Sequence, residues 1–147
     1  MRYTSEITIN RPVDVVTRLF DDPKNLYAWM DGLQSFELLS GEQGQPGAKA
    51  KLVYQMGKRR IEMIETITER NLPDIFAGTY DADGVHNIVV NKFIALPDGN
   101  TRYITENEFQ FKGFMRIIAF LMPGAFKKQS YKYLEQFKAF VENHKEA

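Results

Sequence analysis

The chain contains no cysteine, which excludes a disulfide scaffold and a thiolate metal site. Its two histidines, His86 and His144, lie far apart, and no His-x-x-x-His or Glu-x-x-His spacing points to a metal site. No glycine-rich loop joins a strand to a helix, and no Gly-x-Ser-x-Gly elbow is present, so phosphate cradles and serine-hydrolase chemistry are not indicated. We therefore expect no metal and no cofactor.

An excess of charge of either sign is also lacking, because 19 Lys and Arg balance 19 Asp and Glu. This balance argues against general nucleic-acid binding, which needs clustered positive charge. The longest apolar run, Phe114 to Met122, is too short to cross a bilayer and contains Arg116, so we expect no transmembrane segment. Met1 to Asn10 alternates polar and apolar residues, unlike a signal peptide, and we expect a cytoplasmic protein.

What is present fits one ordinary globular unit. The 147 residues are 44% hydrophobic and 26% charged, which is typical of a soluble domain with one core. We see no internal repeat, low-complexity segment or linker, so we predict a single domain over residues 1–147.

The C-terminal stretch predicts the dominant helix. After Pro123, apolar residues recur every three or four positions and form one face of an amphipathic helix. Before Pro123, the segment Phe114–Met122 is apolar all round except for Arg116, which predicts that it is covered on more than one side. Because Pro123 lacks an amide donor, it should kink or break the helix. We predict one long terminal helix from Gly113 to Ala147 with a bent, apolar N-terminal half.

The part of the chain before Gly113 is predicted to be mostly β-strand. Alternation predicts a first strand over Tyr3–Ile9, and proline and aspartate signals predict two short helices, over Pro12–Phe20 and Pro23–Met30. Six more strands follow, separated by short turns, which indicates an antiparallel meander. They are Leu33–Ser40, Ala48–Met56, Arg60–Glu69, Ile75–Tyr80, Val85–Leu96 and Thr101–Phe111.

Several stretches in this order resemble the START-like (SRPBCC) superfamily, and most closely its polyketide cyclase/dehydrase and lipid-transport branch. They are Arg11-Pro12-Val13-Asp14-Val15-Val16, Asp22-Pro23-Lys24-Asn25-Leu26-Tyr27-Ala28-Trp29, Gly99-Asn100-Thr101-Arg102, and the passage from Phe120-Leu121-Met122-Pro123 to Lys127-Lys128-Gln129. The resemblance implies an α+β helix-grip fold, with a curved seven-stranded antiparallel sheet wrapped around the C-terminal helix and a cavity between them. Relatives hold lipids, sterols, plant hormones, quinones or polyketides there; some are enzymes and many only bind.

One alternating set of side chains on each strand should face the helix. For residues 85–96 we choose the set with Asn87, Val89, Asn91 and Phe93, although the opposite set with His86, Ile88, Val90 and Ile94 is nearly as apolar. The predicted cavity residues are Trp29, Leu52, Tyr54, Met63, Glu65, Asn87, Val89, Asn91, Tyr103, Thr105, Asn107, Met122, Phe126, Tyr133 and Phe137.

Glu65 is the candidate catalytic residue. A carboxylate among apolar side chains has a raised pKa and can act as a general acid or base, with Tyr54, Tyr103 or an asparagine as partner. Two plainer interpretations are that Glu65 pairs with a nearby Arg or Lys, or that a bulge turns it outward. The asparagines and threonines of the set are expected to bond to each other or to water.

Two further features have a structural and a functional interpretation. Trp29 is expected to close the mouth of the fold by packing, or to border a gate formed by Phe114–Met122. The basic cluster Gly57-Lys58-Arg59-Arg60 is expected to be a solvated hairpin tip, or a contact for an anionic headgroup.

The sequence favours a binding protein for a hydrophobic small molecule that is lipid-like, quinone-like or polycyclic. The alternative is a cyclase- or dehydratase-like enzyme that uses Glu65. A third interpretation is a protein- or membrane-interaction module that uses Phe114–Met122. A monomer and a homodimer are both left open.

Overall fold

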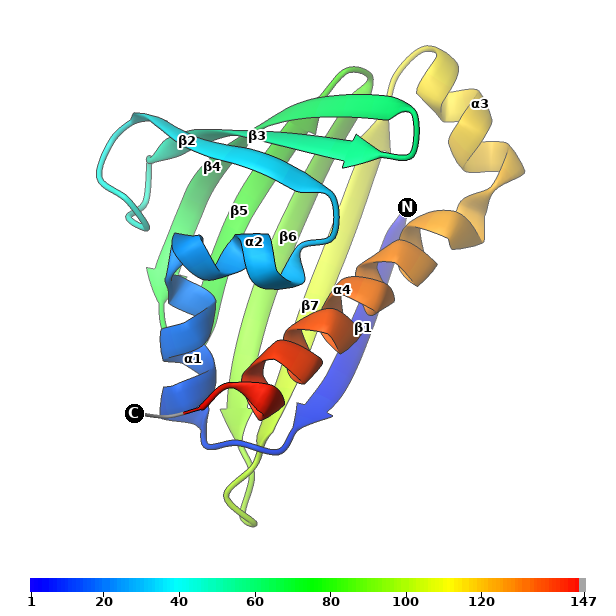
Figure 1. Ribbon diagram of the computed structural model, residues 1–147. Helices are drawn as coiled ribbons and strands as arrows, with labels where there is room; N and C mark the ends of the chain where they lie inside the picture. Colours follow the sequence, from blue (N-terminus) through cyan, green and yellow to red (C-terminus); the bar gives the residue numbers. More distant parts are fainter. Residues whose placement is uncertain (146–147) are drawn as a thin grey trace.

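The computed structural model describes residues 1–145 and contains one seven-stranded antiparallel sheet (Figure 1). The strands are β1 (Arg2–Ile9), β2 (Leu33–Ser40), β3 (Lys49–Met56), β4 (Arg59–Asn71), β5 (Ile75–Ala82), β6 (Val85–Ala95) and β7 (Thr101–Phe111). Their order across the sheet is β1-β7-β6-β5-β4-β3-β2. Strands β2 to β7 form the predicted meander, and β1 pairs antiparallel with β7, so the first and last strands are neighbours.

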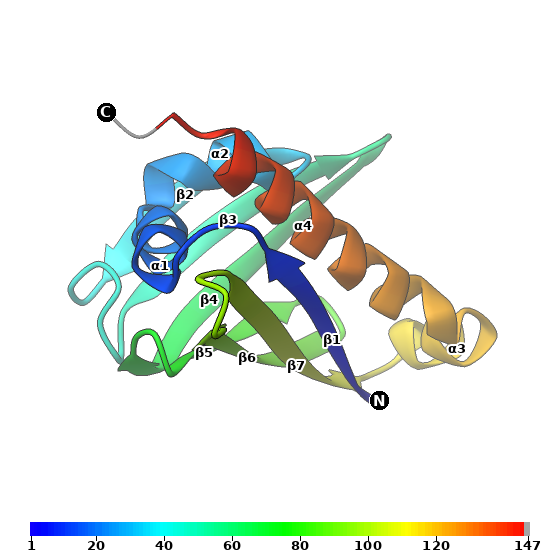
Figure 2. The same cartoon turned by 90° about the horizontal axis from the view of Figure 1, so that it is seen from below.

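Apart from the helix that directly follows β7, the helices lie on the concave side of this curved sheet (Figures 1 and 2). Helix α1 (Val13–Asp21) begins one residue after the predicted start, with Pro12 as its N-cap. A single 3-10 turn, η1 (Pro23–Asn25), is capped by Asp22, whose Oδ1 accepts from the Lys24 amide at 3.0 Å. It leads into the short helix α2 (Leu26–Trp29). The predicted α+β helix-grip fold is confirmed.

The terminal helix is two helices, not one bent helix. Helix α3 (Phe114–Leu121) ends at Met122, which has φ −132° and ψ 58°, and α4 (Pro123–Asn143) begins at the proline. The break is complete because a residue before proline is disfavoured in the helical region and Pro123 has no amide to continue the ladder. The predicted end at Ala147 lies outside the described residues, which stop at Lys145.

The main core lies where α1, α2 and the C-terminal half of α4 meet β6 and β7. Phe137 of α4 is fully buried, and its ring centroid lies 4.8 Å from Trp29, 5.5 Å from Tyr103 and 5.8 Å from Phe20. Leu134 and Val141 are buried one turn to either side, as the amphipathic pattern predicts. This end of the fold is therefore filled with side chains.

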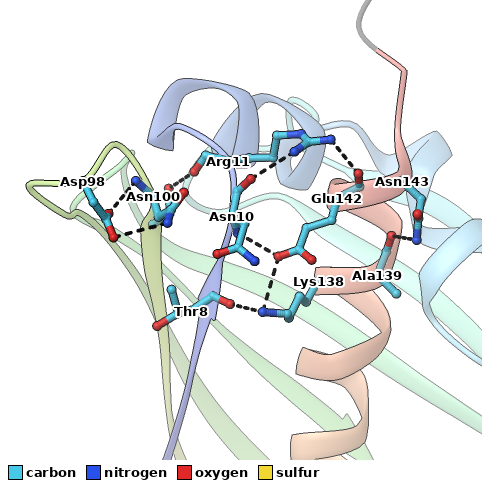
Figure 3. Close-up of polar contacts among 10 residues, drawn as sticks. Thr8, Asn10, Arg11, Asp98, Asn100, Lys138, Ala139, Glu142 and Asn143 are labelled. Carbon is cyan, nitrogen blue, oxygen red and sulfur yellow. Dashed lines mark hydrogen bonds and ion pairs between the residues drawn. The ribbon is translucent and has the colours of Figure 1, made fainter.

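Polar contacts fasten the C-terminal end of α4 to the loop after β1 (Figure 3). Glu142 accepts from the Asn10 amide through Oε2 at 2.7 Å, and its carbonyl accepts from the Arg11 guanidinium at 2.6 Å. Lys138 donates to the Thr8 carbonyl and lies 3.3 Å from Glu142 Oε2. The arginine satisfies one of the carbonyls that every helix C-terminus leaves unpaired.

No helix within residues 1–145 is both long and apolar enough to cross a membrane.

Candidate functional site

Strand register places one set of side chains from β3 to β7 on the concave face. Residues directly opposite each other in antiparallel strands point to the same side of a sheet. Reading across, Leu52 lies opposite Met63, Glu65 opposite Tyr80, and Tyr80 opposite Asn87. Asn87 then lies opposite Phe109, and Val89 opposite Asn107. The chosen face of residues 85–96 is confirmed, because Asn91 and Phe93 are opposite the buried Thr105 and Tyr103.

Burial divides this concave face into two parts. Eight predicted cavity residues lie within the buried interior: Trp29, Leu52, Tyr54, Asn91, Tyr103, Thr105, Asn107 and Phe137. The remaining part, which we call the open half, consists of side chains that are only partly buried: Met56, Ile61, Met63, Glu65, Tyr80, Asn87, Val89, Phe109 and Phe111. Large apolar groups on the concave face therefore keep some contact with solvent.

The position of α4 explains why this half stays open. The helix packs on the edge strand β1 and on α1, α2 and α3 (Figures 1 and 2). Its N-terminal turns reach the sheet through Phe126, whose ring lies 5.1 Å from Phe109 and 5.0 Å from Phe111. Tyr3 of β1 fixes this contact, because its hydroxyl bonds to the Phe126 carbonyl at 3.0 Å and to Ser130 at 2.5 Å.

Glu65 and Tyr80 form the polar centre of the open half. The Tyr80 hydroxyl donates to Glu65 Oε2 at 2.7 Å across the β4–β5 pair. Burial raises the pKa of Glu65, and the hydrogen bond from Tyr80 opposes that shift in part. Burial, together with the neighbouring carboxylate, raises the pKa of Tyr80 well above its ordinary value, so the phenol stays protonated and keeps donating.

Two of the partners suggested for Glu65 from the sequence form their hydrogen bonds elsewhere. Tyr54 directs its hydroxyl to Met30 Sδ at 3.9 Å, and Tyr103 donates to Asn91 Oδ1 at 2.7 Å. The carboxylate also forms no ion pair with Lys or Arg among residues 1–145, and it faces inward despite a bulge between Ile67 and Glu69. Tyr80 was missed because β5 was predicted as a short strand whose inner residues were not assigned.

Two asparagines of this face form hydrogen bonds within the protein, one of them to another asparagine, as expected from the sequence. Asn87 donates to Asn107 Oδ1 at 3.3 Å and to the Glu108 carbonyl at 3.1 Å. Asn91 accepts from Tyr103 and donates to the Phe76 carbonyl at 3.1 Å. Thr105 differs, because its buried hydroxyl has no hydrogen-bond partner among residues 1–145. The same holds for Ser5, directly opposite it on β1.

Trp29 belongs to the packed core and not to a gate. Its ring stacks against Phe20 at 6.4 Å and lies against Phe137, near the C-terminal end of α4. Helix α3 lies at the other end of α4 in both views (Figures 1 and 2), so Trp29 does not border Phe114–Met122. Met122 is exposed in the break between α3 and α4, while Tyr133 is partly buried and near enough to Tyr54 to help raise its pKa.

In the described part of the chain, the basic cluster, the possible metal ligands and a surface groove add no group to this face. The residues of the basic cluster 57–60 are exposed at the β3–β4 turn, where Arg60 bonds Glu62 at 2.6 Å. No group of three or more His, Asp or Glu within residues 1–145 is placed to hold a metal ion. A surface groove of about 460 Å³ runs between β1 and the start of α4, beside Lys127 and Lys128, and does not include Glu65 or Tyr80.

Comparisons with known proteins agree with this architecture. The family described as polyketide cyclase/dehydrase and lipid transport matches residues 1–142. The Zhui aromatase/cyclase from Streptomyces sp. R1128 superposes with a TM-score of 0.82 at 13% identity, covering 97% of this chain and 93% of that one. A conserved protein from Geobacillus kaustophilus gives 0.81 at 19% identity, covering 96% and 95%.

A truncated norcoclaurine synthase from Thalictrum flavum gives a TM-score of 0.76 at 13% identity, covering 99% of this chain and 95% of that one. At these identities the likeness establishes the fold alone. No curated protein matches the chain in sequence.

Proposed function

Because the chain belongs to the polyketide cyclase/dehydrase and lipid transport family of the START-like superfamily, we propose that it binds a hydrophobic small molecule on the open half of the sheet. The ligand is lipid-like, quinone-like or polycyclic. The observation that carries the proposal is the combination of partly exposed apolar side chains with bonded polar groups on one concave face.

Affinity would come from covering the apolar side chains of this face. Met63, Val89, Phe109 and Phe111 are each partly exposed, and removing apolar surface from water is worth about 25 cal/mol per Å² before the costs of association. An apolar ligand contributes in the same way, because its own apolar surface is also removed from water. A strongly polar or charged ligand would lose hydration here without enough partners to replace it.

Orientation would come from the polar groups. Glu65 with Tyr80, and Asn87 with Asn107, offer hydrogen-bonding groups on adjacent strands, about one strand spacing apart. A ligand with one or two oxygen functions on an apolar skeleton matches this arrangement, since few polar groups fix the orientation in an otherwise apolar site.

The test compares two substitutions of neighbouring valines on opposite faces of β6. Val89→Trp fills the open half, whereas Val90→Trp places the same bulk on the convex face. Mass spectrometry of an organic extract identifies any co-purified ligand, and fluorescence of anilinonaphthalene sulfonate reports apolar binding in its absence. We expect Val89→Trp to weaken dye binding by about tenfold or more and Val90→Trp to leave it unchanged. If the affinity for the dye is unchanged in Val89→Trp but lost in Phe120→Ser, the proposal is refuted, because the dye would then be bound to α3.

A second candidate is an enzyme in which Glu65 acts as general acid or base. The raised pKa of Glu65 beside the donating Tyr80 favours it, since a desolvated carboxyl holds its proton to higher pH and is a stronger base once it has lost it. An aromatase/cyclase and a norcoclaurine synthase share the fold. Tyr80 would hold the carboxyl in position through the hydrogen bond that it donates.

Glu65→Gln separates the two candidates once a ligand is known. Gln keeps an acceptor for Tyr80, so a purely binding role predicts a change in affinity of at most about 1–2 kcal/mol. A general acid or base predicts nearly normal binding with turnover reduced by about 10² or more. We favour binding, because Tyr80 is the only side chain bonded to Glu65 among residues 1–145.

A further inference from the structure

Helix α3 is the most exposed apolar element of the described chain. Phe114, Phe120 and Leu121 are 72%, 83% and 69% exposed, and Ile117 and Met122 are also mostly exposed. The expectation that this segment is covered on more than one side was therefore wrong. Contiguous apolar surface of this kind on one element marks an interaction site, because leaving it in water is costly.

The protein covers only one side of α3. Ala119 is buried, Met115 and Ile118 are partly buried, and these three share a helix face by their spacing of three and four. Met115 packs on the β5–β6 turn, where a Cβ on Gly84 would lie 3.0 Å from Met115 Cγ. With that face held, the opposite face points away from the sheet, and α3 projects at the far end of α4 from α1 and α2 (Figures 1 and 2).

The chain segment that carries this exposed face contains positive charges only. Residues 109–134 contain five Lys or Arg and no Asp or Glu, in a chain whose overall charge is zero. Lys132 is paired with Asp31, but Lys112, Arg116, Lys127 and Lys128 are exposed and form no ion pair among residues 1–145. Local charge of one sign thus coincides with local exposure of apolar side chains.

We propose that α3 docks the protein on a bilayer that contains anionic lipid. The apolar side chains enter the boundary between headgroups and acyl chains, and the four unpaired basic residues lie at the headgroups. A second copy of the chain is a poorer partner, because it would bring the same positive charges against this face. The inference rests on α3 and its flanks alone and stands whether or not the open half binds a ligand.

Flotation with vesicles tests the proposal, using vesicles of phosphatidylcholine alone and of phosphatidylcholine mixed with phosphatidylglycerol. We expect the protein to partition onto the mixed vesicles about tenfold or more better than onto phosphatidylcholine alone, and this preference to fall at high salt. The double variant Phe120→Ser with Leu121→Ser should lose about tenfold or more on both vesicles. Lys127→Gln with Lys128→Gln should lose most of the preference for the anionic vesicles.

Matched controls place equivalent changes at the opposite end of the fold. Leu39→Ser removes an apolar side chain that is 50% exposed on β2, and Lys24→Gln with Arg102→Gln removes two exposed positive charges. Both should bind like the wild type, as should Val89→Trp, which separates this test from that of the ligand site. Failure to bind mixed vesicles would overturn the proposal, as would binding that survives loss of Phe120 and Leu121. Sedimentation velocity showing a dimer that dissociates in the same double variant, without vesicle binding, would also overturn it and assign α3 to a contact between copies.

Discussion

Truncating one phenylalanine at each end of α4 tests the division between a filled core and an open half. Phe137 is fully buried among the rings of Trp29, Tyr103 and Phe20. These neighbours belong to three different elements and pack on one another, so they cannot collapse into the space that Phe137→Ala leaves. We therefore expect the full cost of a buried Phe, about 3–5 kcal/mol of the free energy of unfolding.

Phe126 occupies the corresponding place at the other end of the helix, where the surroundings differ. It is partly exposed and contacts two rings, Phe109 and Phe111, which are themselves partly exposed. Water can enter the space left by Phe126→Ala, so little cavity cost is added to the lost transfer free energy. We expect a loss of about 1–2 kcal/mol.

Equilibrium unfolding in urea measures both values, with far-ultraviolet circular dichroism as the probe and the fluorescence of Trp29 as a check on two-state behaviour. Phe114→Ala serves as the control, because a mostly exposed Phe should cost no more than about 0.5 kcal/mol. A loss below about 1 kcal/mol for Phe137→Ala would mean that α4 is not held against the sheet. Equal losses for Phe137→Ala and Phe126→Ala would mean that no open half exists.

Three shorter predictions concern the buried carboxylate, one buried hydrogen bond and the packing of α3. Because the pKa of Glu65 is raised by burial, the folded state holds this proton more tightly than the unfolded state, so wild-type stability falls as pH rises from the ordinary carboxyl pKa through the raised one. Glu65→Gln cannot titrate, so its stability relative to the wild type should increase over that range, by about 1.4 kcal/mol per pKa unit; a difference independent of pH would contradict the burial of this carboxyl. Tyr103→Phe leaves the Asn91 oxygen without its donor and should cost about 1–3 kcal/mol in urea unfolding, whereas no loss would mean that Asn91 finds another donor. Amide hydrogen exchange should be faster in α3 than in residues 134–141 of α4, since α3 packs through one face only; equal protection would show that α3 is held as firmly as the core.

The arrangement of the sheet could be predicted from the sequence because its determinants are local. Alternation in β3, β4 and β7 assigned the inner faces, and short turns forced neighbouring strands to pair. In β6 both faces were nearly equally apolar, yet the chosen face places Phe93 against Tyr103, with ring centroids 4.6 Å apart. The opposite face ends in Ile94, which is exposed.

The Glu65–Tyr80 pair and the exposure of α3 could not be predicted, for two physical reasons. The pair depends on the register of the β4–β5 hairpin, and a bulge between Ile67 and Glu69 shifts that register by an amount that periodicity does not reveal. The alternation of Phe76, Gly78 and Tyr80 indicates that Tyr80 is on the inner face, but it does not indicate which residue of β4 lies opposite. For α3, an all-apolar sequence does not show how many of its sides the rest of the fold covers, and the structure covers only one.

The pairing of β1 with β7 has a consequence for the time order of folding. Strands β2 to β7 each pair with a strand that is next in sequence, but β1 pairs with β7, about a hundred residues further along the chain. Closing such a long loop reduces the entropy of the chain before the contacts between β1 and β7 can stabilise it, and non-local pairing of this kind slows folding. During synthesis, β1 leaves the ribosome before β7 and cannot pair with β7 until that strand has followed it. The side of β1 that pairs with β7 is therefore open to strands of other chains until β7 has been synthesised, and the opposite side of β1 remains an edge of the finished sheet.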